Sequence, residues 1–240
     1  MILISGQQQR GSTKVTVHQI LALAHPARNG IDGIEQRTVF RFRSYSITTS
    51  DTFSKNVSLI LYFMKSFLET FYSLVHSGDA ALDLGAGKGI HALAMTKKGA
   101  FVTALEKKIG EEHIQSSSIQ WHSDDIRDWV KKTTDTELYN IILAKNLLQF
   151  CAKEWVLSTL LPVLKRILKH GGVIGIETFG APPEPPFAQS HHSYWSLKEL
   201  ESEFGEWEKI FLYTGAEQRK DMGGISRKFF ITDIILRKAG

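Results

Sequence analysis

The 240-residue chain has a single cysteine, Cys151, and no Cys and His residues at the spacing of a zinc site. One cysteine cannot form a disulfide within the chain, and this scarcity is typical of a protein from a reducing compartment. No metal site is expected. A long uncharged hydrophobic run is also lacking, because Lys65 and Glu69 interrupt the most hydrophobic segment, residues 57–75. A membrane span needs about 20 nearly uncharged residues, so this segment is interpreted as an amphipathic core helix.

The basic residues do not cluster. The 29 Lys and Arg against 25 Asp and Glu give a net charge of +4, but they are scattered along the chain. Nucleic-acid binders usually cluster their basic residues, so no nucleic-acid partner is expected. The N-terminal MILIS lacks the basic region and the length of a secretory signal, while residues 1–31 contain three basic residues and no acid, which faintly resembles an organelle-targeting segment. We expect a cytoplasmic protein without membrane association.

Short apolar runs alternate with helical patterns from residue 57 onward, which indicates a parallel sheet with helices on both faces. The expected fold is α/β: a three-layer, doubly wound, mostly parallel seven-stranded sheet. Residues 57–240 are expected to form this domain, and residues 1–56 an extension of unknown role, with a possible short helix at 18–24 and a strand at 38–43. The expected strands are 80–84, 100–105, 119–122, 139–144, 173–178, 207–213 and 229–236; the expected helices are 57–75, 90–98, 154–169, with a kink or restart at Pro162, and 196–203.

The stretch ALDLGAGKG, residues 81–89, places alternating glycines directly after a buried strand that contains Asp83. Ligands of such sheets bind beyond the carboxyl ends of the strands, where glycine lets the backbone approach them. The stretch is not a Walker A loop, because Gly89 rather than Ser or Thr follows Lys88, and Ile90 occupies the third glycine position of the dinucleotide fingerprint. A tight strand–helix turn without a ligand remains an alternative. An S-adenosylmethionine loop, with its acid before the glycines, is the favoured interpretation.

Two further acidic positions follow the next two strands. Glu106 ends the second strand, where a carboxylate can accept both hydroxyls of a ribose. Asp125-Ile126 follows the third strand, where an acid can bind the adenine amino group while the apolar neighbour packs on the ring. The alternatives are a solvated charge at Glu106, beside Lys107, and a helix N-cap at Asp125. Three such positions in order at successive strand ends favour the cofactor.

The segment LDLGAGKGIHALAMTKKGAFVTALEKK resembles the cofactor half of class I S-adenosylmethionine-dependent methyltransferases. The chain from about residue 81 to 238 is similar, more narrowly, to the tellurite-resistance methyltransferase family. The more diagnostic matches are LKHGG at 168–172, the YWS and KEL segments at 194–200, EWE at 206–208, and the charged segment 215–230. The chain departs from that family in residues 1–56, in Gln218-Arg219 where the family tends to have His-Arg, and in Lys145-Asn146 after the fourth strand, where small residues are common.

The resemblance implies that S-adenosyl-L-methionine is the cofactor and that the chain is a methyltransferase. The expected cofactor-binding residues are Asp83, Gly85, Ala86, Gly87, Glu106, Lys107, Asp125, Ile126 and Lys145.

The expected acceptor is a small soft nucleophile or compact anion, such as tellurite, selenite or a thiol. A metalloid oxyanion needs groups that hold its oxygens rather than a base, and the candidates for this role are Arg219, Arg227 and His191, with His192 beside it. The Pro-Pro pairs of residues 181–187 follow the fifth strand, whereas nucleic-acid amino methyltransferases carry such a motif after the fourth. The alternatives are a cofactor-binding protein without activity, and a methyltransferase that acts on RNA or a small amine.

Overall fold

The computed structural model describes residues 2–9, 12–24, 38–48, 66–181, 192–220 and 224–240. By its contacts the chain divides into two compact units, residues 1–64 and 65–240. Within the described residues, no helix combines the length and the apolar character that crossing a membrane requires.

The first unit contains a three-stranded antiparallel sheet, β1-β2-β3. Its strands are β1 (Ile2–Gln9), β2 (Ser12–Ala24) and β3 (Thr38–Thr48). The strand expected at 38–43 is therefore confirmed, and the short helix expected at 18–24 is wrong. Residues 18–24 pair with β3 along their whole length, and β2 also pairs with β1. The ladder with β3 satisfies the backbone of these residues more completely than an isolated helical turn, so tertiary context overrides the local preference.

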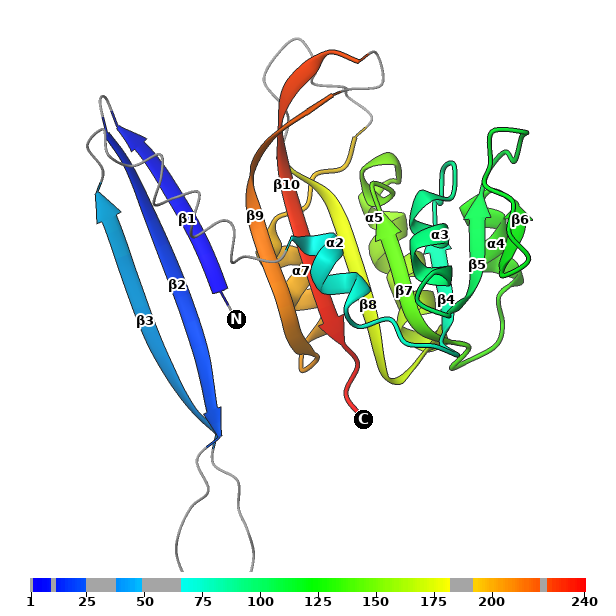
Figure 1. The fold of residues 1–240 in the computed structure, drawn as a ribbon, viewed down its shortest axis with the longest axis horizontal. Helices are drawn as coiled ribbons and strands as arrows, with labels where there is room; N and C mark the ends of the chain where they lie inside the picture. The colour runs from blue at the N-terminus through cyan, green and yellow to red at the C-terminus, as the bar shows by residue number, and fades with distance from the viewer. Residues whose placement is uncertain (1, 10–11, 25–37, 49–65, 182–191, 221–223) are drawn as a thin grey trace, which may run out of the picture. The chain divides into compact units, whose positions relative to one another are not determined.

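The second unit contains a seven-stranded sheet in the order β6-β5-β4-β7-β8-β10-β9 (Figure 1). Neighbours from β6 to β8 are parallel, and β10 is antiparallel to both β8 and β9. The expectation of a doubly wound, mostly parallel seven-stranded α/β sheet is confirmed. The last three strands are longer than expected. The strands are β4 (Ala80–Leu84), β5 (Phe101–Glu106), β6 (Ile119–Ser123), β7 (Tyr139–Lys145), β8 (Leu168–Ala181), β9 (Glu208–Lys220) and β10 (Ser226–Arg237).

The helices lie on both faces of this sheet, with α2 in front of it and α7 behind it in Figure 1. Pro162 lies in the first turn of α6, as one of the two expected arrangements at this residue. The start of the helix expected at 57–75 falls outside the described residues, and its described part ends three residues early. The helical elements are α2 (Phe67–Tyr72), α3 (Ile90–Thr96), α4 (Ile126–Lys132), η1 (Leu148–Phe150), α5 (Lys153–Trp155), η2 (Val156–Leu160), α6 (Leu161–Ile167) and α7 (Leu197–Phe204).

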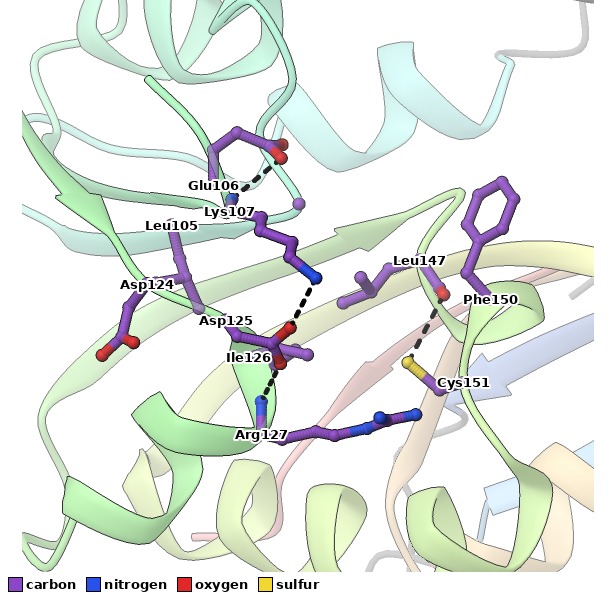
Figure 2. A pocket seen from close by; sticks show the side chains of 11 residues that line it. Leu105, Glu106, Lys107, Asp124, Asp125, Ile126, Arg127, Leu147, Phe150 and Cys151 are labelled. Carbon is purple, nitrogen blue, oxygen red and sulfur yellow. Dashed lines mark hydrogen bonds and ion pairs between the residues drawn. The ribbon is translucent and has the colours of Figure 1, made fainter.

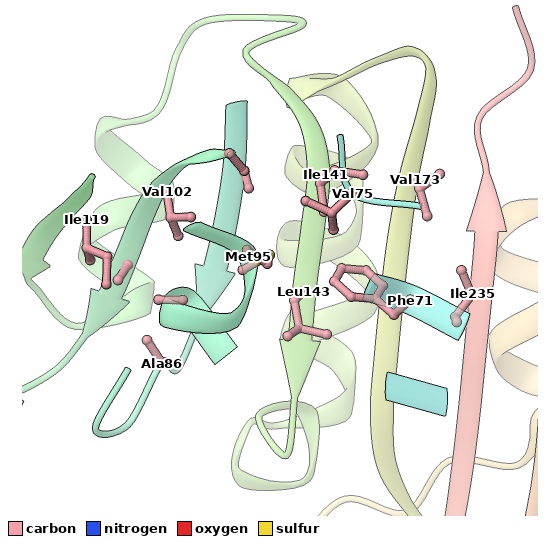
Figure 3. Close-up of a cluster of buried hydrophobic side chains, with 14 of the residues drawn as sticks. Phe71, Val75, Ala86, Met95, Val102, Ile119, Ile141, Leu143, Val173 and Ile235 are labelled. Atoms are coloured by element: carbon pink, nitrogen blue, oxygen red, sulfur yellow. The ribbon is translucent and has the colours of Figure 1, made fainter. Parts of the chain in front are cut away.

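One hydrophobic cluster joins α2 and α3 to a face of the sheet (Figure 3). The ring of Phe71 on α2 is fully buried and packs on Gly175, where an added Cβ would lie 2.5 Å from the ring. Met95 on α3 and Leu143 on β7 are also fully buried. The packing holds α2 and α3 against the strands whose carboxyl ends carry the polar residues described next.

Candidate active site

The glycine loop between β4 and α3 adopts backbone conformations that favour glycine. Gly85, Gly87 and Gly89 have φ values of 67°, 53° and 86°. The backbone N–H groups of Gly85 and Ala86 donate to Leu105 O at 2.9 and 3.0 Å, which fixes the loop against the end of β5. An added Cβ at Gly89 would lie 2.7 Å from the Trp121 ring, whereas at Gly87 it would meet nothing within 4 Å. The loop therefore leaves open space beside Gly87.

The Glu106 carboxylate is held by this loop. Its Oε2 accepts a hydrogen bond from Gly87 N at 2.8 Å, and its Oε1 accepts one from Lys107 N at 2.9 Å. The contacts orient the carboxylate at the carboxyl end of β5, and each oxygen can accept a second hydrogen bond. The carboxylate is thus preorganised to receive two neighbouring hydroxyl donors.

Asp125 caps α4, which confirms the N-cap interpretation weighed for this residue. Its Oδ1 accepts a hydrogen bond from Arg127 N at 2.9 Å, and its Oδ2 lies 3.1 Å from Lys107 Nζ. The hydrogen bond from the Arg127 backbone and the one from Lys107 lower the pKa of this carboxyl. Asp125, Lys107 and Arg127 all line the cavity described below.

A cavity of about 330 Å³ lies at the carboxyl ends of β4 and β5 (Figure 2). Five residues expected from the sequence line it: Gly85, Glu106, Lys107, Asp125 and Ile126. The other lining residues were not expected, and they are Leu105, Asp124, Arg127, Leu147, Phe150 and Cys151. Leu147, Phe150 and Cys151 come from the turn after β7, which no motif of the sequence marks as part of a site.

Asp83 lies on β4, two residues before the glycine loop, and is not among the residues that line the cavity. Its side chain is 1% exposed, and its Oδ2 has no hydrogen-bond partner among the described residues. Burial, with a smaller contribution from the charge of Glu106, raises the pKa of Asp83 to about 7, against a lowering by the Ala92 backbone hydrogen bond. A buried carboxyl with an unpaired oxygen beside a glycine loop fits a cationic ligand group.

A second group of polar side chains, here called the charge cluster, consists of Lys145, Glu177, Tyr213, Glu217, Arg219 and Asp233. Lys145, Glu177, Asp233 and Tyr213 are cross-strand partners on β7, β8, β10 and β9. Directly opposite residues of neighbouring strands point to the same face, so the four form one row. Leu84 is paired with Ala144, so Gly85 follows β4 at the level of Lys145. The row therefore lies at the same height along the strands as the start of the glycine loop.

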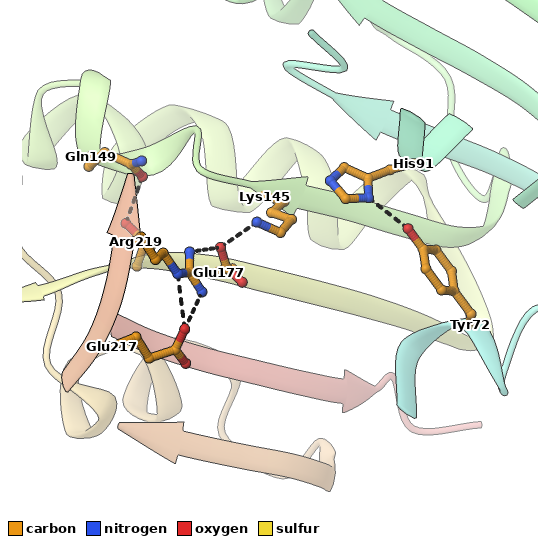
Figure 4. Close-up of polar contacts among 8 residues, drawn as sticks. Tyr72, His91, Lys145, Gln149, Glu177, Glu217 and Arg219 are labelled. Carbon is orange, nitrogen blue, oxygen red and sulfur yellow. Dashed lines mark hydrogen bonds and ion pairs between the residues drawn. The ribbon is translucent and has the colours of Figure 1, made fainter. Parts of the chain in front are cut away.

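Glu177 is the centre of the charge cluster (Figure 4). Its Oε1 lies 2.6 Å from both Lys145 Nζ and Arg219 Nη1. Burial by itself raises the pKa of Glu177, but the Arg219 hydrogen bond and the Lys145 charge outweigh it, so the pKa is lowered. Arg219 also contacts Glu217, whose Oε2 lies 2.9 Å from both Nε and Nη2. Two carboxylates thus neutralise the guanidinium group expected to bind an oxyanion.

Of the other two expected catalytic residues, Arg227 is described by the structure. Arg227 lies directly across the β9–β10 ladder from Arg219 and is half-buried. His191 lies outside the described residues. The ring of His192 makes edge contacts with Phe150 and Phe179, with centroids 5.2 and 5.5 Å away. Lys145, expected to bind the cofactor, pairs with Glu177 and does not line the cavity.

Sequence reasoning missed Glu177 and Asp233, although each leaves a signal. Both are single carboxylates inside otherwise apolar strands, in the runs VIGIETFG and FFITDIIL. Buried acids in such runs are rare unless they are paired or functional. The Tyr72–His91 pair was missed as well: Tyr72 Oη lies 2.6 Å from His91 Nδ1, and burial, followed by the Lys145 charge, lowers the pKa of His91.

No family model matches the chain, and no curated protein matches it significantly. Solved structures are similar in fold. TehB from Haemophilus influenzae is 17% identical, with a TM-score of 0.57 over 99% of this chain and 88% of that one. The N-methyltransferase NodS from Bradyrhizobium japonicum, in complex with S-adenosylhomocysteine, is 12% identical, with a TM-score of 0.54 over 72% and 84%. The 1,6-didemethyltoxoflavin-N1-methyltransferase from Burkholderia thailandensis, also with S-adenosylhomocysteine, is 13% identical, with a TM-score of 0.51 over 78% and 84%.

Proposed function

We propose that the chain is an S-adenosylmethionine-dependent methyltransferase that acts on a small soft nucleophile, a thiol. The observation that carries the proposal is the Glu106 carboxylate, held by Gly87 N in a cavity that Asp125 and Ile126 also line. The fold, which has the architecture of known methyltransferases, supports it. The finer resemblance to the tellurite-resistance family stays a prediction.

The residues of the cavity suit the parts of this cofactor. Glu106 would accept the ribose hydroxyls, and Ile126 and Leu147 would pack on the adenine ring. Asp83 would compensate the positive charge of the amino-acid part. The cofactor supplies a methyl group on a sulfonium that leaves as a neutral thioether. The chain must therefore mainly hold the nucleophile in line and keep water out.

The charge cluster favours a thiol over a metalloid oxyanion among the acceptors considered from the sequence. Arg219 is engaged by Glu177 and Glu217, and Lys145 by Glu177. Within the charge cluster, both cations are already engaged by carboxylates rather than open to tellurite or selenite. A neutral thiol does not need such an open cation.

Isothermal titration with S-adenosylmethionine tests the cofactor site. Asp83→Ala and Glu106→Ala should each weaken binding at least tenfold, because the first removes a compensating buried charge and the second a charge-assisted contact worth about 1.5–3 kcal/mol. Asp128→Ala is the matched control, since Asp128 is an exposed acid on α4 that pairs with Lys131. Wild-type affinity in both site variants would mean that the site is assigned to the wrong residues.

A turnover screen with labelled cofactor then tests the acceptor. We expect small thiols to be methylated in preference to selenite, tellurite, small amines and RNA. Cofactor binding without any turnover would favour a non-catalytic binding protein, and methylation of RNA alone would contradict the small-molecule acceptor.

A further inference from the structure

Asp233 on β10 is a buried carboxyl group that forms no ion pair within the charge cluster. Its side chain is 3% exposed, and its Oδ1 has no hydrogen-bond partner among the described residues. A buried polar atom without a partner is rare in a folded protein and often marks a functional group. The unpaired oxygen makes Asp233 a candidate functional group.

Asp233 lies on the side of the glycine loop that is away from Glu106. It is the cross-strand partner of Glu177, which is itself the partner of Lys145 at the end of β7. From Gly85 the row runs over β7 and β8 to β10, which is three strand spacings, or about 14 Å. Glu106 lies on the other side of Gly85. The Glu106 carboxylate, which would hold the ribose, and the Asp233 carboxyl thus lie on opposite sides of the glycine loop.

The charges around Asp233 set its protonation. The facing groups are Lys145 and Glu177 on β7 and β8, and Tyr213, Glu217 and Arg219 on β9. With Asp233 neutral, the two cations balance the two carboxylates. Burial, followed by the charge of Glu177, raises the pKa of Asp233 to about 8. The pKa of this carboxyl is therefore close to that of a thiol, which is about 8.5.

We propose that Asp233, beside Glu177, accepts the proton that the methyl acceptor loses. This rests on the proposed function and deepens it: the acceptor carries a proton on its nucleophilic atom. The S–H bond breaks, its electron pair stays on the acceptor sulfur, and the proton passes to the ionised Asp233 carboxyl. The sulfur then bonds to the methyl carbon as the bond to the sulfonium breaks, so a thioether, S-adenosylhomocysteine and one bound proton result.

Two thiol probes test the proposal with wild type and Asp233→Asn. The alkyl thiol 2-mercaptoethanol is protonated at neutral pH and needs a base, whereas thiophenol is largely ionised there and does not. Asp233→Asn should lower kcat/KM for 2-mercaptoethanol about 100-fold, the lower end of the usual effect of a general base, and change that for thiophenol less than about threefold. A residue with only a structural role would affect both thiols equally.

Thr232→Val is the matched control. Thr232 is a fully buried neighbour on β10 whose Oγ1 also lacks a partner among the described residues, and it points to the opposite face. It should leave both rates unchanged. A second readout is carbon-13 NMR of the Asp233 carboxyl, which should titrate near pH 8 and shift when 2-mercaptoethanol is added.

Several results would overturn the proposal. These are equal losses for the two thiols, no loss for either, or an Asp233 carboxyl that does not titrate near pH 8. Methylation of selenite but of neither thiol by the wild type would do the same. Isothermal titration distinguishes a failure of the Asp233 proposal from a failure of the proposed function. If S-adenosylmethionine binds while the thiol test fails, Asp233 is wrongly assigned and the cofactor site stands. If it does not bind, the proposed function itself fails.

Discussion

Asp83→Asn should abolish a loss of stability that the wild type shows as the pH rises, while weakening the proposed cofactor site. The pKa of Asp83 is raised from 3.8 to about 7 in the folded protein. Between these values the folded protein binds more protons than the unfolded chain, so the free energy of unfolding falls as pH rises through this window. The decrease from this one group is on the order of 4 kcal/mol, because one pKa unit corresponds to about 1.4 kcal/mol. Asparagine has no proton to lose and removes this decrease.

The measurement is urea unfolding of wild type and Asp83→Asn at about pH 5 and about pH 8.5. Because roughly two of the three pKa units are crossed between these conditions, the variant should gain about 3 kcal/mol on the wild type from the lower to the higher pH. The substitution also has a pH-independent effect on the free energy of unfolding, and comparing the two pH values cancels it. Asp128→Asn, at an exposed site, should show no such gain.

The same variant should bind S-adenosylmethionine at least tenfold more weakly, because the amide cannot compensate a positive charge. If the variant gains stability on the wild type between the two pH values and also binds S-adenosylmethionine more weakly, the Asp83 carboxylate serves binding at the expense of stability. If wild type and variant lose stability in parallel from pH 5 to pH 8.5, Asp83 does not carry a raised pKa, and the reasoning fails.

Three further predictions concern the loop, a helix cap and ligand choice. Gly89→Ala should lower the free energy of unfolding by about 1–3 kcal/mol, because its φ is 86° and the new Cβ would meet the Trp121 ring; an unchanged urea midpoint would refute this. Ser196→Ala should cost about 1 kcal/mol, because Ser196 forms a capping box with Glu199 at the start of α7; Ser202→Ala serves as a control in the same unfolding assay. Micromolar NAD and ATP should not displace bound S-adenosylmethionine, since the loop has neither the dinucleotide nor the Walker pattern; displacement in a competition titration would contradict it.

Local patterns were sufficient to predict the seven-stranded sheet of the second unit. Most of these strands contain a short apolar run bounded by turn residues, and the glycine after β4 signals a strand–helix turn. The lengths of β8, β9 and β10 were underestimated, because polar residues at their ends, such as Lys169 and Lys220, belong to the strands. The helix expected at 18–24 failed for a related reason: pairing with β3 decided its conformation.

For the cavity, the sequence alone determined the acids and glycines at the ends of β4, β5 and β6, because parallel strands bring their carboxyl ends to one edge. Only the tertiary structure added Leu147, Phe150 and Cys151, since the turn after β7 has no pattern of its own.

The charges around Arg219 were also decided by the tertiary structure alone. From the sequence, Arg219 is a free cation suited to an oxyanion. In the fold, cross-strand register places Glu177 beside Asp233. Arg219 on β9 then forms ion pairs with Glu177 and with Glu217. Contacts between residues about 40 to 60 positions apart depend on strand order and register, which no local pattern encodes. The sequence therefore determined the class of fold and the sheet edge at which we propose the cofactor binds, and the tertiary structure decided the charges around Arg219.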